Sequence, residues 1–369
     1  MRLGTSWENH AMNALTETLR RSRAIARFTA VHYTICPVLV ASSIAVELGW
    51  LEEEFRRVGA GAIYLRSLPD NAGWLPHFTH GLPALFREGG AISAIHAKAD
   101  LTDTTLIGLT WVRNGSGGQI LVNSDSDIHS VAGLKGRRIG LYRSLNKDKV
   151  DFRRATAERG ILLALELAGL GRKEVEIVDI EDAETPQYQP ATRPAEYLAQ
   201  GREKEKKTDP EIEALRAGRI EAIYAGGGRT EKLVEGGLFT AIEDLSRHPD
   251  WTLQIANSPF TNAVNTDFAK QHPEVVVAFL RASIRAARLI NENPSFAAQF
   301  FKRTTGYHDA HQIQNLIAGV NLVPQLSDRN LAALDVQKKF LLDHGYIKND
   351  FNVRTWADDR YLQEALRSL

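Results

Sequence analysis

The chain has 369 residues, of which 43% are hydrophobic and 24% are charged, and its 45 Lys and Arg residues balance its 45 Asp and Glu residues. This length allows two domains with cores of their own, and the zero net charge gives no reason to expect a nucleic acid or an anionic membrane as partner. The single cysteine excludes an internal disulfide, and no apolar run of about 18 residues is present that could span a bilayer.

The first 28 residues carry charges throughout and lack the apolar core of a secretory signal, so we expect a cytoplasmic protein. Further along the chain we predict strands at 26–33, 61–68, 91–95, 104–112, 118–123, 137–142, 175–180, 220–226 and 260–266. We predict helices at 38–48, 81–87, 150–169, 209–217 and 228–236, and an almost wholly helical chain beyond residue 270. This alternation is typical of an α/β protein with largely parallel sheets.

Residues 184–211 are polar, include four prolines and end in a cluster of charges. This composition predicts a solvated loop.

Cys36 directly precedes Pro37 at the start of the helix predicted at 38–48. Proline is favoured at the first helical position, so the pattern predicts Cys36 at the N-cap. A helix N-terminus would favour the thiolate of Cys36, whereas an apolar cleft would favour the neutral thiol. The alternative for a lone cysteine is an inert, packed core residue.

A second informative stretch is WLPHFTHGLPALFREGG, residues 74–90. His77 and His80 precede the helix predicted at 81–87, Arg87 lies at its end, and Gly89 and Gly90 follow. A guanidinium supplies a fixed charge and a fork of donors, and consecutive glycines allow left-handed backbone in which N–H groups converge on an anion. The stretch therefore predicts an oxyanion site, and its alternative is a set of solvated side chains beside a glycine cap. We expect no metal, because no third ligand follows the two histidines at a matching interval.

Five segments, in this order, resemble the two-lobed periplasmic-binding-protein fold of the nitrate, sulfonate and taurine binding proteins. They are CPVLVASSIAVELGWLEEEF, HSVAGLKGRRIGL, ALRAGRIEAIYAGGG, NTDFAKQHPEVVVAFLRASIRAARLINENP and GYIKNDFNVRTWADD. The resemblance implies an α/β protein of the type II periplasmic-binding-protein fold, with a ligand cleft between the lobes that suits anions. It implies a lobe I at 1–115 and 260–369, a lobe II at 116–259, and a hinge at 113–118.

The pair TICP and HFTHGLPALFREGG also resembles the active-site segments of the aromatic sulfinate desulfinases, which have this fold. Position by position, the resemblance places the catalytic residues at Cys36, His77 and Arg87, and the backbone that binds the anion at Gly90. The sequence departs from the family pattern at Thr34-Ile35, at His80-Gly81 and at Leu85. These departures affect the pocket wall rather than the reacting groups.

The resemblance implies a cofactor-free hydrolase that cleaves the C–S bond of an aromatic sulfinate with water, giving an arene and sulfite. Cys36 would act either as a thiol that protonates the ring carbon or as a thiolate that attacks sulfur. Gly89, Trp74, Phe78 and His80 are further candidates for substrate binding. We expect a small aromatic sulfinate or related anion as the partner, no nucleic acid, no membrane, and a monomer rather than an obligate oligomer. The alternative functions are the substrate-binding component of an ABC importer for sulfonate, nitrate or a related anion, and a cytosolic ligand sensor.

Overall fold

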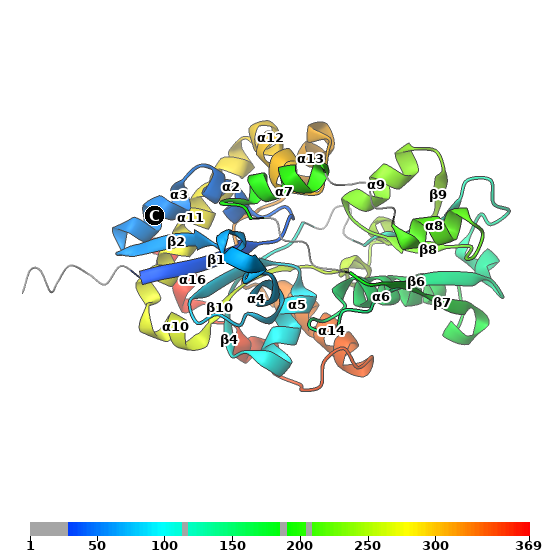
Figure 1. Ribbon diagram of the computed structural model, residues 1–369, viewed down its shortest axis with the longest axis horizontal. Coiled ribbons are helices and arrows are strands. Elements are labelled where there is room, and N and C mark those ends of the chain that lie inside the picture. Colours follow the sequence, from blue (N-terminus) through cyan, green and yellow to red (C-terminus); the bar gives the residue numbers. More distant parts are fainter. Residues whose placement is uncertain (1–28, 113–116, 185–189, 204–208) are drawn as a thin grey trace, which may run out of the picture.

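The computed structural model describes residues 29–112, 117–184, 190–203 and 209–369. It shows two lobes side by side (Figure 1), one built around β1 to β4 and β10 and the other around β5 to β9. Within these described ranges, no helix is both long and apolar enough to cross a membrane. The N-terminal 28 residues and part of the predicted hinge, residues 113–116, lie outside the described residues.

The first lobe contains one five-stranded sheet, in the order β2-β1-β3-β10-β4. Its strands are β1 (Thr29–Ile35), β2 (Ala60–Tyr64), β3 (Leu85–Gly89), β4 (Thr104–Thr110) and β10 (Phe260–Asn265). β1 pairs in parallel with β2 and β3, whereas β10 runs antiparallel to both of its neighbours, β3 and β4. Because β10 follows the strands of the second lobe in the sequence, its place inside this sheet brings the chain back into the first lobe.

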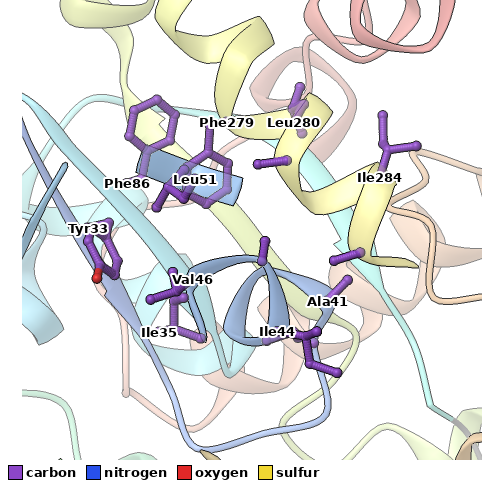
Figure 2. Packing of buried hydrophobic residues seen from close by; sticks show 14 of the residues in the cluster. Tyr33, Ile35, Ala41, Ile44, Val46, Leu51, Phe86, Phe279, Leu280 and Ile284 are labelled. Atoms are coloured by element: carbon purple, nitrogen blue, oxygen red, sulfur yellow. The ribbon is translucent and has the colours of Figure 1, made fainter. Parts of the chain in front are cut away.

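Helices cover this sheet on both sides. They are α2 (Ala41–Glu47), α3 (Trp50–Arg57), α4 (Trp74–Thr79), α5 (Ala91–His96), α10 (Thr266–Gln271), α11 (Pro273–Glu292), α12 (Pro294–Thr304), α13 (Ala310–Ile317), α14 (Asp328–Asp343), α15 (Val353–Trp356) and α16 (Arg360–Arg367). The buried, apolar side of α11 packs against α2, α3 and α16. In the core beneath it, Phe86 of β3 stacks on Phe279 of α11 with ring centroids 4.5 Å apart (Figure 2). Phe86 is therefore part of the core of the first lobe.

The second lobe contains a three-stranded sheet, β8-β5-β9, and a parallel pair, β6-β7. Its strands are β5 (Gln119–Asn123), β6 (Arg138–Ser144), β7 (Glu176–Asp182), β8 (Ile223–Ala225) and β9 (Phe239–Asp244), and its helices include α6 (Phe152–Leu167), α8 (Pro210–Arg216) and α9 (Gly228–Glu235). A bridge between Ile139 and Ala222 connects the two sheets. The domain boundaries at 115/116 and 259/260 stay predictions.

Two predicted elements around the second motif are wrong. The helix predicted at 81–87 is a turn that leads into β3, and the strand predicted at 91–95 is α5. All five residues of β3 are buried, and the strand pairs with β1 and β10. Its hydrophobic residues follow neither a helical nor a strand period, so pairing within the sheet decides its conformation. In α5 the residues from Ala91 to Ile95 are all buried. When every residue of a short segment is buried, its hydrophobic pattern is the same for a helix and for a strand.

The solvated loop predicted at 184–211 is wrong in its middle, where α7 (Pro194–Glu203) forms and packs against α2 and α12. Figure 1 shows α7 beside these helices of the first lobe. Tyr197 of α7 packs against the core of that lobe, and this contact stabilises a helix that its polar composition does not predict. Residues 185–189 and 204–208 of the predicted loop lie outside the described residues.

Candidate active site

Cys36 directly follows β1, and its backbone N–H donates to the carbonyl of Glu88 on β3 over 2.8 Å. This bond extends the β1–β3 pairing by one residue, so the chain reaches helical geometry only later. Helix α2 begins at Ala41 with Val40 at its N-cap, and the predicted N-cap position of Cys36 is therefore wrong. Because the field of a helix terminus falls off within one turn, the groups that act on this sulfur are the side chains around it.

Three predicted site residues meet at the end of β1. The sulfur of Cys36 lies 3.6 Å from Nε2 of His77, which is on α4, and 3.8 Å from Nη2 of Arg87, which is on β3. Cys36 is partly exposed, whereas His77 and Arg87 are buried. The structure therefore brings these three side chains together, and their catalytic roles stay predictions.

His77 is fixed through both ring nitrogens. Its Nδ1 lies 2.7 Å from the hydroxyl oxygen of Thr34, and its Nε2 faces the sulfur of Cys36. Burial, followed by the positive charge of Arg87, holds the pKa of His77 well below its ordinary value. A neutral imidazole has one donor and one acceptor, so either nitrogen can carry the proton while the other accepts. The pair Thr34 and Cys36 can satisfy both tautomers, because a hydroxyl and a thiol each donate and accept.

Arg87 is only 1% exposed, and its guanidinium is held by backbone carbonyls. Its Nε donates to the carbonyl of His77 over 2.8 Å and its Nη1 to that of Gly90 over 3.2 Å. No carboxylate of the described residues lies within ion-pair distance of this guanidinium. Burial lowers the pKa of Arg87, and a negative charge on Cys36 would raise it. The site thus contains a buried cationic group whose remaining surface faces the sulfur.

Glycine is required at residues 89 and 90 by space. A Cβ at Gly89 would lie 2.1 Å from the sulfur of Cys36, and one at Gly90 would lie 2.4 Å from the side-chain nitrogen of Asn257. Gly90 has a φ of −53°, so the left-handed backbone that the paired glycines predict is not present there. Asn257 in turn accepts from the N–H of Ile92 over 2.9 Å, which fixes its amide against Gly90.

A cavity of about 440 Å³ lies between the lobes, and Cys36, His77 and Arg87 are not themselves among the residues that line it. Pro37, which follows Cys36, and Asn257, which contacts Gly90, are both part of its wall. The first lobe and the return into it contribute Pro37, Val38, Leu39, Val112, Ala256, Asn257, Ser258, Phe260, Gly306 and Tyr307; the second contributes Phe152, Arg153, Thr156, Ala157, Glu211, Tyr224, Gly226, Gly227 and Arg229. The wall is mainly apolar and aromatic, and its charged groups come from the second lobe.

The additional predicted pocket residues lie behind this wall rather than in it. Phe78 stacks nearly parallel to Phe152, with ring centroids 6.2 Å apart, and Trp74 contacts Phe78 edge-on. His80 is buried, Nε2 of its ring lies 2.9 Å from the carbonyl oxygen of Leu85, and burial lowers its pKa to about 3. Phe78 thus supports the cavity wall, and His80 connects α4 to β3.

The sequence did not single out the residues of the second lobe that line the cavity. Phe152 and Arg153 begin a correctly predicted helix, but no pattern showed that this end faces the first lobe. Glu211 follows the pair Asp209-Pro210, which is a typical start of a helix. This signal could have assigned Glu211 to an ordered helix rather than to the charged segment that precedes the helix. In the described parts of the chain, no group of three or more His, Cys, Asp or Glu side chains is placed to hold a metal ion.

No protein-family model matches the chain. Over 361 residues the chain is 25% identical to 2'-hydroxybiphenyl-2-sulfinate desulfinase of Rhodococcus erythropolis, and the alignment covers 90% of this chain and 93% of that protein. The similarity to a desulfinase that the two active-site segments predict is confirmed by this match along nearly the whole chain.

Two groups of solved structures share the fold. A serine-for-cysteine mutant of DSZB in complex with biphenyl-2-sulfinic acid matches with a TM-score of 0.72 at 21% identity, covering 93% of this chain and 100% of that chain. The alkanesulfonate-binding protein SsuA from Xanthomonas axonopodis pv. citri, bound to MOPS, matches with a TM-score of 0.59 at 15% identity, covering 90% of this chain and 98% of that chain. The predicted two-lobed periplasmic-binding-protein fold is confirmed.

Proposed function

We propose that this protein is an aromatic sulfinate desulfinase, a hydrolase that acts on a carbon–sulfur bond. Its substrate is an aryl sulfinate, and its products are the arene and sulfite. The observation that carries the proposal is the contact of the Cys36 sulfur with His77 at 3.6 Å and with Arg87 at 3.8 Å, beside a cavity between the lobes. The similarity to a desulfinase over 90% of the chain supports it. The cytoplasmic location and the monomeric state stay predictions.

Arg87 supports an anionic substrate. A buried guanidinium without a carboxylate partner is costly unless an anion compensates its charge. Because Nε and Nη1 already donate to backbone carbonyls, Nη2 is the group directed toward the sulfur and available to a sulfinate oxygen. Nη2 carries two N–H groups, so one can face the sulfur while the other donates to a sulfinate oxygen. Gly90 lies against Asn257, which is part of the cavity wall. The N–H of Gly90 is the second donor that we assign to the sulfinate.

The thiol of Cys36 is the proton donor in this proposal. The S–H bond breaks, its proton goes to the ring carbon that bears sulfur, and the C–S bonding pair forms the new C–H bond. Sulfur dioxide leaves and takes up water to give hydrogen sulfite and a proton, which returns to the Cys36 thiolate. Two charges of the same sign repel each other, so the bound sulfinate favours a neutral thiol over a thiolate before the reaction.

His77 and Arg87 stabilise the thiolate that this step leaves behind. Burial and the charge of Arg87 hold the pKa of His77 well below its ordinary value and so favour the neutral ring. An N–H at Nε2 then donates to the sulfur when Thr34 donates to Nδ1. Arg87 supplies the compensating positive charge. Both groups are fixed before the reaction, which lowers the cost of developing charge on the sulfur.

The test is sulfite release from purified protein supplied with a panel of aryl sulfinates, with alkanesulfonates and nitrate as controls. We expect sulfite and the arene in equal amounts from at least one aryl sulfinate. A Cys36→Ser variant should bind the same compound with similar affinity and react at least about 100-fold more slowly. A protein that binds sulfonates or nitrate tightly and releases no sulfite from any sulfinate is an importer component or a sensor, and the proposal is then wrong.

Intact-mass measurements during turnover separate the two roles of Cys36. Proton donation leaves the mass of the protein unchanged, whereas attack of a thiolate on sulfur adds a covalent group to Cys36. A trapped adduct would therefore show that Cys36 acts as a nucleophile and not as a proton donor. The proposal that the protein is a desulfinase would still hold.

A further inference from the structure

A lysine of the second lobe is buried against the first lobe near the candidate active site. Lys149 precedes α6, and its side chain is only 2% exposed. Its Nζ lies 5.0 Å from the ring centre of Phe78 on α4 and 5.1 Å from that of Phe152 on α6. These two rings stack nearly parallel between the lobes, with their centres 6.2 Å apart. The ammonium group and the two rings therefore form one contact between α4 and the second lobe.

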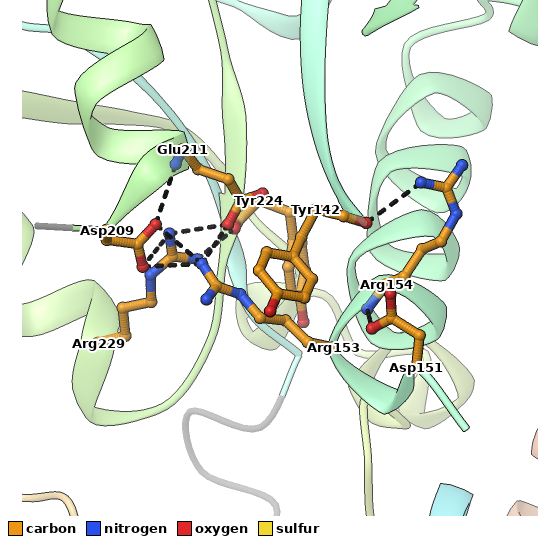
Figure 3. A network of polar contacts seen from close by, with 8 residues as sticks. All are labelled: Tyr142, Asp151, Arg153, Arg154, Asp209, Glu211, Tyr224 and Arg229. Atoms are coloured by element: carbon orange, nitrogen blue, oxygen red, sulfur yellow. Dashed lines mark hydrogen bonds and ion pairs between the residues drawn. The ribbon is translucent and has the colours of Figure 1, made fainter. Parts of the chain in front are cut away.

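The second lobe fixes the position of this ammonium group. Oε1 of Glu184 lies 2.8 Å from Nζ of Lys149, and Glu184 also accepts from the hydroxyl group of Ser144. The carboxylate of Asp151 caps α6 (Figure 3), since it accepts from the backbone N–H of Ser144 over 2.6 Å and from that of Arg154 over 3.0 Å. The loop that carries Lys149 is thus tied at both of its ends to the start of α6.

Phe78 connects this contact to the imidazole that faces Cys36. The rings of His77 and Phe78 meet edge-on, with their planes at 90° and their centres 4.8 Å apart. The polar contacts of the imidazole are with Thr34 and Cys36. Two polar contacts and one aromatic ring therefore hold the imidazole, and the position of that aromatic ring depends on the second lobe.

The environment of the contact suits a cation. The face of an aromatic ring carries partial negative charge, and its attraction for a cation is strongest where both are removed from water. Glu184 compensates the charge of Lys149. Burial is the largest cause of the low pKa of His77, followed by the charge of Arg87. The charges of Arg66 and Lys149 lower this pKa further, so the lysine also favours the neutral imidazole.

We propose that Lys149 is a positioning residue for His77. Its ammonium group holds the ring of Phe78 in the stack, and Phe78 keeps the imidazole turned toward the sulfur of Cys36. The inference rests on the proposed desulfinase function, in which His77 stabilises the thiolate. Lys149 is not among the residues that line the cavity, so its effect falls on the reaction step rather than on substrate binding.

The experiment replaces Lys149 by methionine, which keeps an unbranched apolar stem without the charge, and by arginine, which keeps a cation that stacks on aromatic rings. We expect Lys149→Met to lower kcat for sulfite release about 10-fold with KM changed less than about twofold, and Lys149→Arg to retain about half of kcat. The matched control is Glu184→Gln, which removes the ion pair, keeps an oxygen that accepts from Lys149 and should stay within about threefold of the wild-type kcat. Circular dichroism with a thermal melt checks that each variant is folded.

A double-mutant cycle separates this contact from a general loss of packing. Phe78→Leu should lower kcat about as much as Lys149→Met. The double variant should then lose no more than either single variant, because both substitutions act through the same contact.

Crystal structures of the variants give a readout that does not depend on turnover. Nε2 of His77 should stay about 3.6 Å from the sulfur of Cys36 in Lys149→Arg. In Lys149→Met we expect it to move away by at least about 0.5 Å, a displacement that matters in a catalytic site.

Four outcomes overturn the inference: Lys149→Met keeps the wild-type kcat, Lys149→Arg does not restore it, the losses in the double-mutant cycle add, or the imidazole keeps its distance from the sulfur in Lys149→Met. A protein that releases no sulfite from any aryl sulfinate, but whose imidazole moves as expected, contradicts the desulfinase function and supports the positioning role of Lys149.

Discussion

The sulfur of Cys36 and Nε2 of His77 lie 3.6 Å apart although 41 residues separate them in the chain. The contact exists because β1 and β3 pair side by side, and His77 of α4 is held against both strands by Thr34 of β1 and Arg87 of β3. Arg87 fixes the same arrangement from the other side, since it donates to the backbone carbonyl of His77 and approaches the sulfur. Three predictions test this arrangement, and a fourth tests the burial of a carboxyl group on β3.

Arg87→Lys should lower kcat/KM for an aryl sulfinate about 100-fold or more. A lysine at this site supplies a charge but not the fixed fork that donates to the carbonyls of His77 and Gly90 and to the substrate together. Steady-state kinetics measure the effect, and circular dichroism with a thermal melt checks that the variant is folded. A folded variant that retains a third of the wild-type kcat/KM would show that Arg87 does not bind the reacting group.

Thr34→Val should reduce kcat about fivefold to tenfold with little change in KM. The substitution removes the hydroxyl that lies 2.7 Å from Nδ1 of His77, so the ring loses one of the two contacts that orient it toward Cys36. Thr34→Ser, which keeps the hydroxyl, is the control and should stay within about twofold of the wild type. Equal kcat values for the valine and serine variants would mean that the orientation of His77 does not limit the reaction.

Gly89→Ala should abolish most sulfite release by displacing the thiol. The new Cβ would lie 2.1 Å from the sulfur of Cys36, a distance at which one of the two atoms must move. Gly171→Ala in the second lobe is the control, because the nearest atom to its Cβ is 3.6 Å away. Unchanged activity in both variants would show that the position of the sulfur relative to His77 and Arg87 tolerates a shift.

The stability of the protein should change with pH through the carboxyl group of Glu88, which lies on β3 and is only 2% exposed. Burial raises the pKa of Glu88 from 4.5 to about 7. Between these pH values the folded protein keeps a proton that the unfolded chain releases, so this group makes folding less favourable as the pH rises through the window. At pH 8 the loss is complete and is about 3 kcal/mol by linkage, as an order of magnitude.

Glu88→Gln removes this titration and should therefore stabilise the protein at pH 8 relative to the wild type, with a much smaller effect at pH 5. Urea unfolding at the two pH values measures the difference, and Glu213→Gln on the exposed side of α8 is the control. The same change in stability at both pH values would show that the carboxyl group of Glu88 has the same protonation state in the folded and unfolded protein.

Local chemistry and pattern were enough to predict much of this protein. The strand before Cys36, the helix at 150–169 and the helical chain beyond residue 270 follow from the periodicity and the residue types of each segment. The structure has such an element at each of these places. The identities of Cys36, His77 and Arg87 as a group also came from short segments of the sequence.

Only the tertiary structure decided the conformation of β3, the start of α2 and the formation of α7. Each of these depends on partners that are distant in the chain: β10 for β3, Glu88 for the extended backbone of Cys36 ahead of α2, and α12 for α7. The same holds for Glu211, which lines the cavity where α8 places it against Arg153 of α6. Sequence patterns report the preference of a segment for a local conformation, whereas pairing and burial between distant segments select the conformation that forms and the side chains that meet in a cavity.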